Sequence, residues 1–240
     1  MAPGRDANAS FAQLSIRLLG LDFDVHSPAE VLRLIAARPV GAPFAYVVMP
    51  NANHLIRLTR DPGICRPLHE DAWLRLLNSW VVARLARLFR LPAPPVVTSG
   101  DLTAALVRDT VAAGEWVTIL GLTRAEAQEL AVRTKLRFVH HDPRIGFETH
   151  PDSFEQALRF IEDHPARLVF LAIGSPRQEI VARALAARGI AVGTGLCVGA
   201  SLQVLAGTEK RAPIMLQRAG LEWAWRLAQN PRRLWRRYLV

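Results

Sequence analysis

Short apolar runs alternate with segments of helical period along most of this chain, and this alternation constrains the fold more than any other feature. Each run has the length and the turn-residue borders of a buried strand. The runs cover residues 44–49, 73–77, 116–120, 136–140, 168–173 and 190–194. Strands that alternate with helices form mainly parallel sheets, because each crossover returns over a face of the sheet. The sequence therefore predicts an α/β fold with a mainly parallel sheet and helices on both faces.

Two of the intervening segments carry helix start signals, in which a capping residue is followed three positions later by glutamate. These are Thr123 with Glu126, and Asp152 with Glu155. Ligands of parallel sheets bind beyond the carboxyl ends of the strands, where the strand order reverses. The loops after the predicted strands are therefore the expected location of a site.

Positive charge is concentrated at the C-terminal end. Residues 207–240 contain eight Lys or Arg against two Asp or Glu, so they account for +6 of the net charge of +9. The pattern predicts three parts: a flexible arm over residues 1–15, an α/β domain over 16–206, and a basic amphipathic appendage over 207–240. A charge excess of this kind indicates an anionic partner, either a lipid surface or a nucleic acid.

The last part of the appendage has two faces. On a helical wheel, residues 231–239 place Leu234, Trp235, Tyr238 and Leu239 within one arc, while Arg232, Arg233, Arg236 and Arg237 fill the other. This arrangement is typical of an interfacial helix on an anionic membrane. The alternative is a terminal helix packed on its own domain with a solvated basic face.

Two cysteines are too few for a disulfide framework, and no apolar run approaches the roughly 20 residues that span a bilayer. The first residues also lack the apolar core of an export signal. We therefore expect a cytoplasmic protein, peripheral on the inner face of the cell membrane. A non-enzymatic nucleic-acid-binding module is the less favoured alternative, because the body of the chain carries only a small charge.

Metal and dinucleotide motifs are weak. The glycines at 193, 195 and 199 miss the dinucleotide spacing by one residue, and His140, His141 and His150 fit no standard metal site. We expect no metal and no cofactor. In contrast, the stretch Gly174-Ser175-Pro176-Arg177-Gln178-Glu179 follows a predicted strand and opens a helix, which suits a phosphate or a sugar. An ordinary strand-to-helix turn would look the same.

An ordered series of motifs carries a family resemblance from Leu19 to Tyr238. The series comprises the stretches at 47–54, 77–79, 97–102, 174–179 and 199–207, and then Lys210-Arg211-Ala212-Pro213 with the Arg/Trp-rich tail. Together they resemble the TagA/WecG/CpsF-type bacterial glycosyltransferases, glycosyltransferase family 26.

The resemblance implies a Rossmann-like sheet and an inverting, metal-independent glycosyltransferase of surface polysaccharide biosynthesis. A hexose or N-acetylhexosamine-type sugar would pass from a UDP-sugar donor to a polyprenyl-diphosphate-linked acceptor. The appendage would close over the site at the anionic inner-membrane surface. The implied partners are this donor, this acceptor and this surface, without nucleic acid; the oligomeric state is left open and includes a homo-oligomer.

The resemblance also implies site residues. Gln178 would hold the donor, and a larger set would line the substrate pocket. That set is Asn51, Thr98, Ser99, Gly121, Gly174 and Ser175. The expected phosphate contacts are Arg211, Arg232, Arg236 and Arg237.

The chain departs from the family pattern on the pocket side. Asn78 occupies the position of the proposed catalytic aspartate, and an amide cannot accept a proton at neutral pH. Other departures are Met49, Val96, Gln203 and the inverted order Ser99-Gly100. Two interpretations follow: an active transferase whose base is another carboxylate, with Asp101 and Glu179 as candidates, or a catalytically weakened relative that still binds nucleotide-sugar or membrane.

Overall fold

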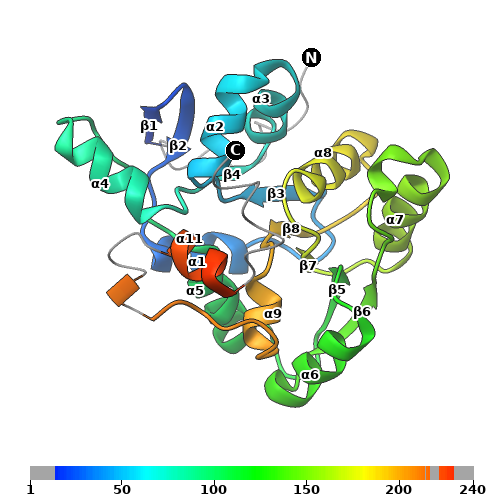
Figure 1. Cartoon of the computed structure of the whole chain (residues 1–240). Helices are drawn as coiled ribbons and strands as arrows, with labels where there is room; N and C mark the ends of the chain where they lie inside the picture. The colour runs from blue at the N-terminus through cyan, green and yellow to red at the C-terminus, as the bar shows by residue number, and fades with distance from the viewer. Residues whose placement is uncertain (1–13, 214, 217–221, 230–240) are drawn as a thin grey trace.

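The structure is a computed structural model that describes residues 14–213, 215–216 and 222–229 (Figure 1). The arm predicted over residues 1–15 therefore lies almost wholly outside the described residues, and Ser15 belongs to a strand. The helix expected at 231–239, with Arg232, Arg236 and Arg237, also lies outside them. Within the appendage, α11 (Glu222–Gln229) is described. The division into arm, domain and appendage stays a prediction.

A six-stranded sheet forms the centre of the molecule, in the order β4-β3-β8-β7-β5-β6, and every neighbouring pair is parallel. The strands are β3 (Ala45–Val48), β4 (Leu74–Arg75), β5 (Trp116–Leu120), β6 (Arg137–His141), β7 (Leu168–Leu171) and β8 (Thr194–Cys197). β7 and β8 are buried along their whole length, and in β7 this burial matches a continuous apolar sequence. The predicted α/β fold is confirmed.

The position predicted for the last strand is wrong. Residues 190–194 were expected to form it, but β8 begins only at Thr194, where pairing with β3 and β7 starts. The preceding residues bond to the loop before β3 instead: the Gly193 N–H donates to the Ala42 carbonyl, and Val192 bridges to Pro43 in the antiparallel sense. The apolar run thus covers the approach to the strand, and the strand itself contains Gly195.

Helices cover both faces of the sheet. One apolar core joins the sheet to α1 (Pro28–Ala36), α5 (Ser99–Ala105), α6 (Arg124–Thr134) and α9 (Ser201–Leu205). A second core on the opposite face joins it to α7 (Pro151–Asp163) and α8 (Arg177–Arg188). Short π and 3₁₀ turns follow α5 and precede α7, at Leu106–Thr110 and Phe147–Thr149.

A third core packs a small antiparallel hairpin against helices near β4. It joins β1 (Ser15–Leu18) and β2 (Leu21–Asp24) to α2 (Ala52–Arg60), α3 (Pro62–Glu70) and α4 (Trp80–Leu88). The buried carboxylate of Asp24 accepts a hydrogen bond from the Arg75 backbone N–H at 2.6 Å, which links the hairpin to the edge of the sheet. This hairpin was not predicted from the sequence.

One of the two expected helix start signals is confirmed. Thr123 and Glu126 form a capping box at the start of α6, each side chain bonding to the other's backbone N–H. The signal at Asp152 is wrong by two residues, because α7 begins at Pro151 after His150. Proline suits the first turn of a helix since it has no N–H to satisfy. Among the described residues, no helix is both long enough and apolar enough to cross a bilayer.

Candidate active site

Loops from four neighbouring strands meet at the carboxyl edge of the sheet, where the strand order reverses. β3 leads to Asn51, β4 to Asn78, β7 to the loop before Gln178, and β8 to Gly199. The first two loops are joined by their backbones, since the Asn78 N–H donates to the Pro50 carbonyl at 2.9 Å. This edge is where a ligand of a parallel sheet is expected.

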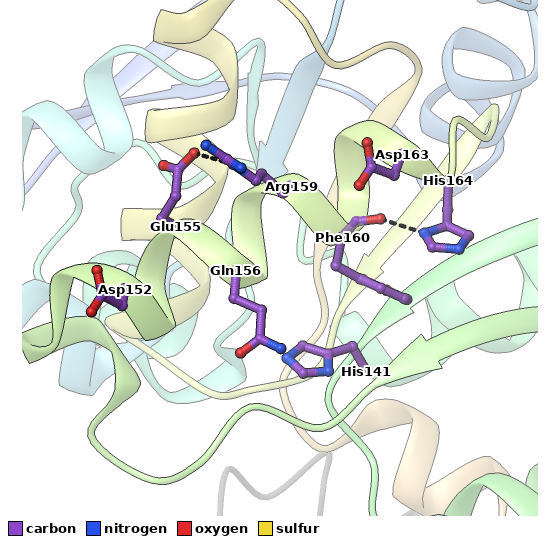
Figure 2. Close-up of a pocket in the computed structure, with 8 residues that line it drawn as sticks. All are labelled: His141, Asp152, Glu155, Gln156, Arg159, Phe160, Asp163 and His164. Atoms are coloured by element: carbon purple, nitrogen blue, oxygen red, sulfur yellow. Dashed lines mark hydrogen bonds and ion pairs between the residues drawn. The ribbon is translucent and has the colours of Figure 1, made fainter.

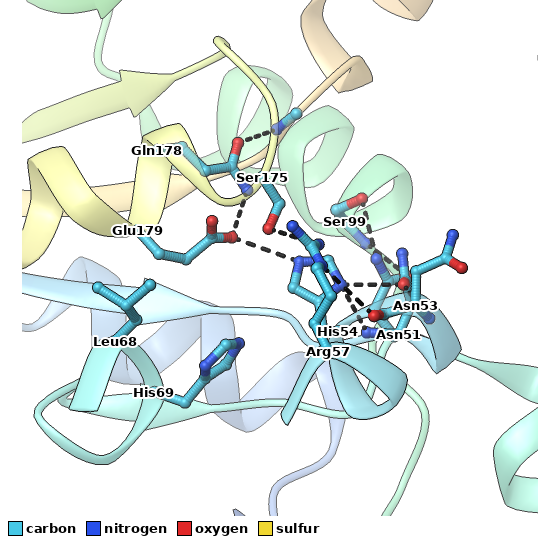
Figure 3. A network of polar contacts seen from close by, with 12 residues as sticks. Asn51, Asn53, His54, Arg57, Leu68, His69, Ser99, Ser175, Gln178 and Glu179 are labelled. Carbon is cyan, nitrogen blue, oxygen red and sulfur yellow. Dashed lines mark hydrogen bonds and ion pairs between the residues drawn. The ribbon is translucent and has the colours of Figure 1, made fainter. Parts of the chain in front are cut away.

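Gln178 bridges two of these loops through both ends of its amide (Figure 3). Its Oε1 accepts from the Gly199 N–H at 2.9 Å, and its Nε2 donates to Glu179 Oε1 at 2.8 Å. The side chain is buried at the first turn of α8. In this arrangement Gln178 ties the loop after β7 to the loop after β8.

Glu179 is a buried carboxylate paired with His54 of α2. His54 Nε2 lies 3.4 Å from Glu179 Oε1, and both side chains are almost completely enclosed. Burial acts to raise the pKa of Glu179, but hydrogen bonds from His54, Gln178 and Ser175 outweigh it and lower the pKa to about 2. Glu179 is therefore ionised at neutral pH and enclosed by its own partners.

The pair continues to Asn51 on the other side of the imidazole. His54 Nδ1 lies 2.9 Å from Asn51 Oδ1 and 3.3 Å from the Asn51 backbone nitrogen. Asn51 also caps α2, because its Oδ1 accepts from the Asn53 N–H at 3.0 Å. A hydrogen-bonded chain thus runs from the loop after β3 through His54 and Glu179 to Gln178, and Figure 3 shows it passing between α2 and α8.

Arg57 places a positive charge beside this series of hydrogen-bonded side chains. Its guanidinium donates to Ser175 Oγ at 2.9 Å and, through Nε, to the Asn53 carbonyl at 3.4 Å. Ser175 follows Gly174, whose φ of +76° lies in the left-handed region that glycine adopts without strain. Neither His54 nor Arg57 is among the site residues predicted from the sequence. Their signal is their place in the first two turns of the helix that follows the strand-end asparagine.

Asn78 forms a second cluster with the start of α5. Its Nδ2 donates to Ser99 Oγ at 3.3 Å, and its Oδ1 accepts from the Ser99 N–H at 3.4 Å. Thr98 caps the same helix by accepting from the Asp101 N–H. A cavity of only ≈ 20 Å³ lies beside these groups. It is lined by Asn78, Thr98, Ser99, Gly100, Ser201, Val204 and Arg211.

Arg211 brings the appendage into this second cluster. Its guanidinium donates to Asp101 Oδ1 at 2.6 Å and to Thr98 Oγ1 at 3.3 Å. The hydrogen bond from Arg211 lowers the pKa of Asp101, with a smaller contribution in the same direction from Thr98. A Cβ at Gly100 would lie 3.4 Å from the Arg211 Cζ, so the missing side chain leaves room for the guanidinium.

The structure thus brings most of the predicted site residues into two adjoining clusters. The first holds Asn51, Gly174, Ser175, Gln178 and Glu179, and the second holds Asn78, Thr98, Ser99, Asp101 and Arg211. Gly121 stands apart at the end of β5. Its φ is +113°, and a Cβ there would lie 2.9 Å from the Ala172 backbone, so it permits the close approach of β5 and β7.

A larger cleft of ≈ 530 Å³ lies elsewhere, between the edge strand β6 and α7 (Figure 2). The Phe160 ring lies between His141 and His164, with ring centroids 5.3 Å and 4.6 Å away. Three acids, Asp152, Glu155 and Asp163, also line it. Neither strand-end cluster contributes to this cleft. Within the described ranges, no group of three or more His, Cys, Asp or Glu side chains is placed to hold a metal ion.

Comparison with known proteins identifies the family of the chain. The sequence profile of the glycosyl transferase WecG/TagA/CpsF family matches residues 16–240. One relative, from Bacillus spizizenii (strain ATCC 23059 / NRRL B-14472 / W23), is 31% identical over 165 residues, which are 66% of this chain and 61% of the relative. It is named N-acetylglucosaminyldiphosphoundecaprenol N-acetyl-beta-D-mannosaminyltransferase. The aligned region thus covers less than two thirds of that relative. Because the family profile spans nearly the whole chain and the resemblance is confirmed, this protein belongs to the WecG/TagA/CpsF family of glycosyl transferases.

Proposed function

We propose that this protein transfers a hexose or N-acetylhexosamine-type sugar from a UDP-sugar to a polyprenyl-diphosphate-linked acceptor during surface polysaccharide assembly. The transfer inverts the anomeric centre and needs no metal, and it takes place at the inner face of the cell membrane. The observation that carries the proposal is the polar network at the strand-order reversal, from Asn51 through His54 and Glu179 to Gln178. The family and the acceptor in the relative's name support it.

In the proposed reaction, the acceptor hydroxyl loses its proton and attacks the anomeric carbon of the donor. The bond from that carbon to the UDP oxygen breaks, and negative charge develops on the departing diphosphate. Arginines stabilise this charge by bidentate hydrogen bonds. Arg211 is the described arginine that lines the Asn78 cavity, and Arg232, Arg236 and Arg237 are proposed to join it from the tail.

The two alternative carboxylates differ in their surroundings. Glu179 is enclosed and hydrogen-bonded to His54 and Gln178, so we assign it a positioning role. The Asp101 carboxylate is 64% exposed beside the Asn78 cluster, which makes it the proposed general base. Its pKa is lowered by Arg211, which weakens it as a base. A substrate diphosphate that attracts Arg211 would release Asp101 and restore its basicity, coupling donor binding to proton removal.

A donor screen in the presence of lipid-linked acceptor tests this function, with both UDP release and glycolipid formation measured. The proposal predicts acceptor-dependent UDP release with at least one UDP-sugar. Asp101→Asn should lower kcat by about 10²–10⁴-fold. Asp109→Asn is the matched control. Asp109 also pairs with an arginine, but it lies in the π turn that follows α5, whereas Asp101 lies in the first turn of α5. Absence of turnover with every donor and acceptor would contradict the proposal.

The weakened-relative alternative is favoured by one specific observation, the amide at position 78. It predicts UDP-sugar binding without acceptor-dependent turnover. Equilibrium binding of UDP and of UDP-sugars to the same preparation separates the two functions. Binding with no turnover under any acceptor condition would support the alternative.

A further inference from the structure

The end of α4 exposes a patch of large apolar and basic side chains. Seven residues of the segment 84–91 are exposed; we call this segment the α4 tip. They are Arg84, Leu85, Arg87, Leu88, Phe89, Arg90 and Leu91. Leu88 is 73% exposed and Phe89 is 69% exposed, values that are unusual for adjacent large apolar residues. Figure 1 shows α4 projecting away from the sheet.

The apolar exposure of the α4 tip is not required by the fold. The inward side of α4 consists of Val82, Ala83 and Ala86, which pack into the core around the β1–β2 hairpin. The tip residues lie beyond this contact. Within the described part of the chain, these side chains are left exposed to water.

The charge of the tip indicates what that partner is. Three arginines alternate with the apolar residues, and no Asp or Glu occurs between Asp71 and Asp101 in the sequence. Within the described residues, no ion pair joins Arg84, Arg87 or Arg90 to an acid. Interleaved arginine, leucine and phenylalanine form a surface that is complementary to anionic head groups above an apolar layer.

The tip is also directly connected to the site. α4 begins at Trp80, two residues after Asn78, and Ser79 caps it by accepting from the Val82 N–H at 3.2 Å. At about 1.5 Å per residue, Leu88 lies roughly 15 Å along the helix from Asn78. A surface that holds the tip would thus place the Asn78 cluster within reach of a head group.

We propose that the α4 tip docks on an anionic lipid surface, with Leu88 and Phe89 entering the acyl boundary and the arginines contacting lipid phosphates. The reason for docking, access to a lipid-linked acceptor, rests on the proposed function. A second copy of this chain is a less suitable occupant, because two such tips would bring six arginines together. Residues 230–240 are also unsuited, since they add four more arginines and no acid.

Partitioning of the full-length protein onto lipid vesicles tests whether the α4 tip docks on an anionic lipid surface. Leu88→Glu combined with Phe89→Glu should lower partitioning onto phosphatidylglycerol-containing vesicles at least tenfold. Val132→Glu on α6 is the matched control, since Val132 is an exposed apolar helix residue at 80% exposure. It should leave partitioning unchanged. Replacing Arg84, Arg87 and Arg90 by Gln should weaken binding at low salt by about fivefold per arginine and reduce the preference for anionic over zwitterionic vesicles.

The measurement uses no donor and no acceptor, so it is independent of glycosyl transfer. Folding is checked by thermal unfolding, which exposed substitutions should leave unaltered. Unchanged partitioning of the Leu88→Glu, Phe89→Glu variant would overturn the proposal. So would loss of a dimer without any change in partitioning, because the tip would then be a contact between copies. If transfer is found, the same variant should keep its turnover on a short-chain, detergent-soluble acceptor and lose it on vesicle-embedded acceptor.

Discussion

Glu179 is a residue whose ionisation depends on its partners rather than on exposure. Its carboxylate is removed from water, a condition that disfavours charge, yet His54 and Gln178 hydrogen-bond to the same oxygen. Removing one partner of such a buried pair lowers the free energy of unfolding, because the other partner is left buried without its counterpart. The pair therefore links Asn51 to Gln178 and makes the local fold sensitive to substitution.

Glu179→Gln should destabilise the protein by about 1–3 kcal/mol at pH 7, because the introduced amide keeps the shape but not the charge-assisted bonds. Urea unfolding measures the change. The pKa of Glu179 is about 2 when folded, against 4.5 for the unperturbed side chain. The contribution is thus complete above about pH 5 and declines as the pH falls from 4.5 towards 2.

The difference in stability between wild type and Glu179→Gln should accordingly shrink in acid. Glu129→Gln serves as the control, since Glu129 forms an exposed pair with Arg133 one helical turn away. Its effect should be within about 0.5 kcal/mol at every pH. A difference for Glu179→Gln that stays constant from pH 6 to pH 3 would show that the carboxylate is not ionised by its partners.

Under the weakened-relative alternative, in which the site lacks a base, Asn78→Asp should raise turnover by an order of magnitude or more. The Ser99 N–H can still donate to the new carboxylate, and the Ser99 hydroxyl can donate in place of the amide, so folding should be preserved. Steady-state kinetics with the best donor measures the effect on kcat. Asn53→Asp is the control, because Asn53 neighbours the site without contacting Ser99 in the described structure. Equal gains in both variants would assign the effect to charge in general.

At the scale of elements, the approach of β5 to β7 depends on a residue without a side chain. Gly121 combines a φ of +113° with a backbone neighbour, Ala172, that a Cβ would meet at 2.9 Å. Both the backbone conformation and the space exclude larger residues. Because β7 leads directly into the loop with Gly174 and Gln178, a shift of β7 would be transmitted to the site.

Gly121→Ala should destabilise the fold by about 2–4 kcal/mol, combining backbone strain with the clash. Gly114→Ala separates the two effects, since Gly114 also has a positive φ, +82°, but has no heavy atom within 4 Å of the added Cβ. It should cost only about 1 kcal/mol. Chemical denaturation of both variants measures the changes. If both variants lost the same free energy of unfolding, the close approach to Ala172 would not contribute to the effect of Gly121→Ala.

At the scale of the whole molecule, the sequence predicts well what depends on local pattern. Five of the six apolar runs coincide with strands, and Thr123 caps α6 as expected. The parallel order then brings Asn51 and Asn78 to one edge. The hairpin of β1 and β2 was missed because two four-residue strands give too short an alternation to stand out.

Contacts between distant segments are outside the reach of such patterns. Asp101 and Arg211 are 110 residues apart, and His54 and Glu179 belong to different helices. Nothing in either segment alone indicates its partner. The motif residues could therefore be named from the sequence. Only the fold shows that Glu179 lies in a buried pair with His54, while Asp101 is an exposed acid paired with Arg211.

The Asp101–Arg211 pair connects the appendage to the body. Beyond it, the Trp225 indole N–H donates to the Lys210 carbonyl at 3.2 Å, so α11 is joined to the same segment. If this connection holds the appendage, Asp101→Asn should increase trypsin cleavage after Lys210 and Arg211 about two- to fivefold, the range expected for losing a partly exposed ion pair. Asp109→Asn removes an equally short but wholly local pair with Arg108 and should leave the cleavage rate unchanged.

The effect of UDP on this cleavage tests the proposed coupling. A diphosphate that draws Arg211 from Asp101 and then holds the arginine should protect the bonds after Lys210 and Arg211 from trypsin. UDP should therefore reduce the cleavage in Asp101→Asn as strongly as in wild type, and faster cleavage on adding UDP would contradict the proposed coupling.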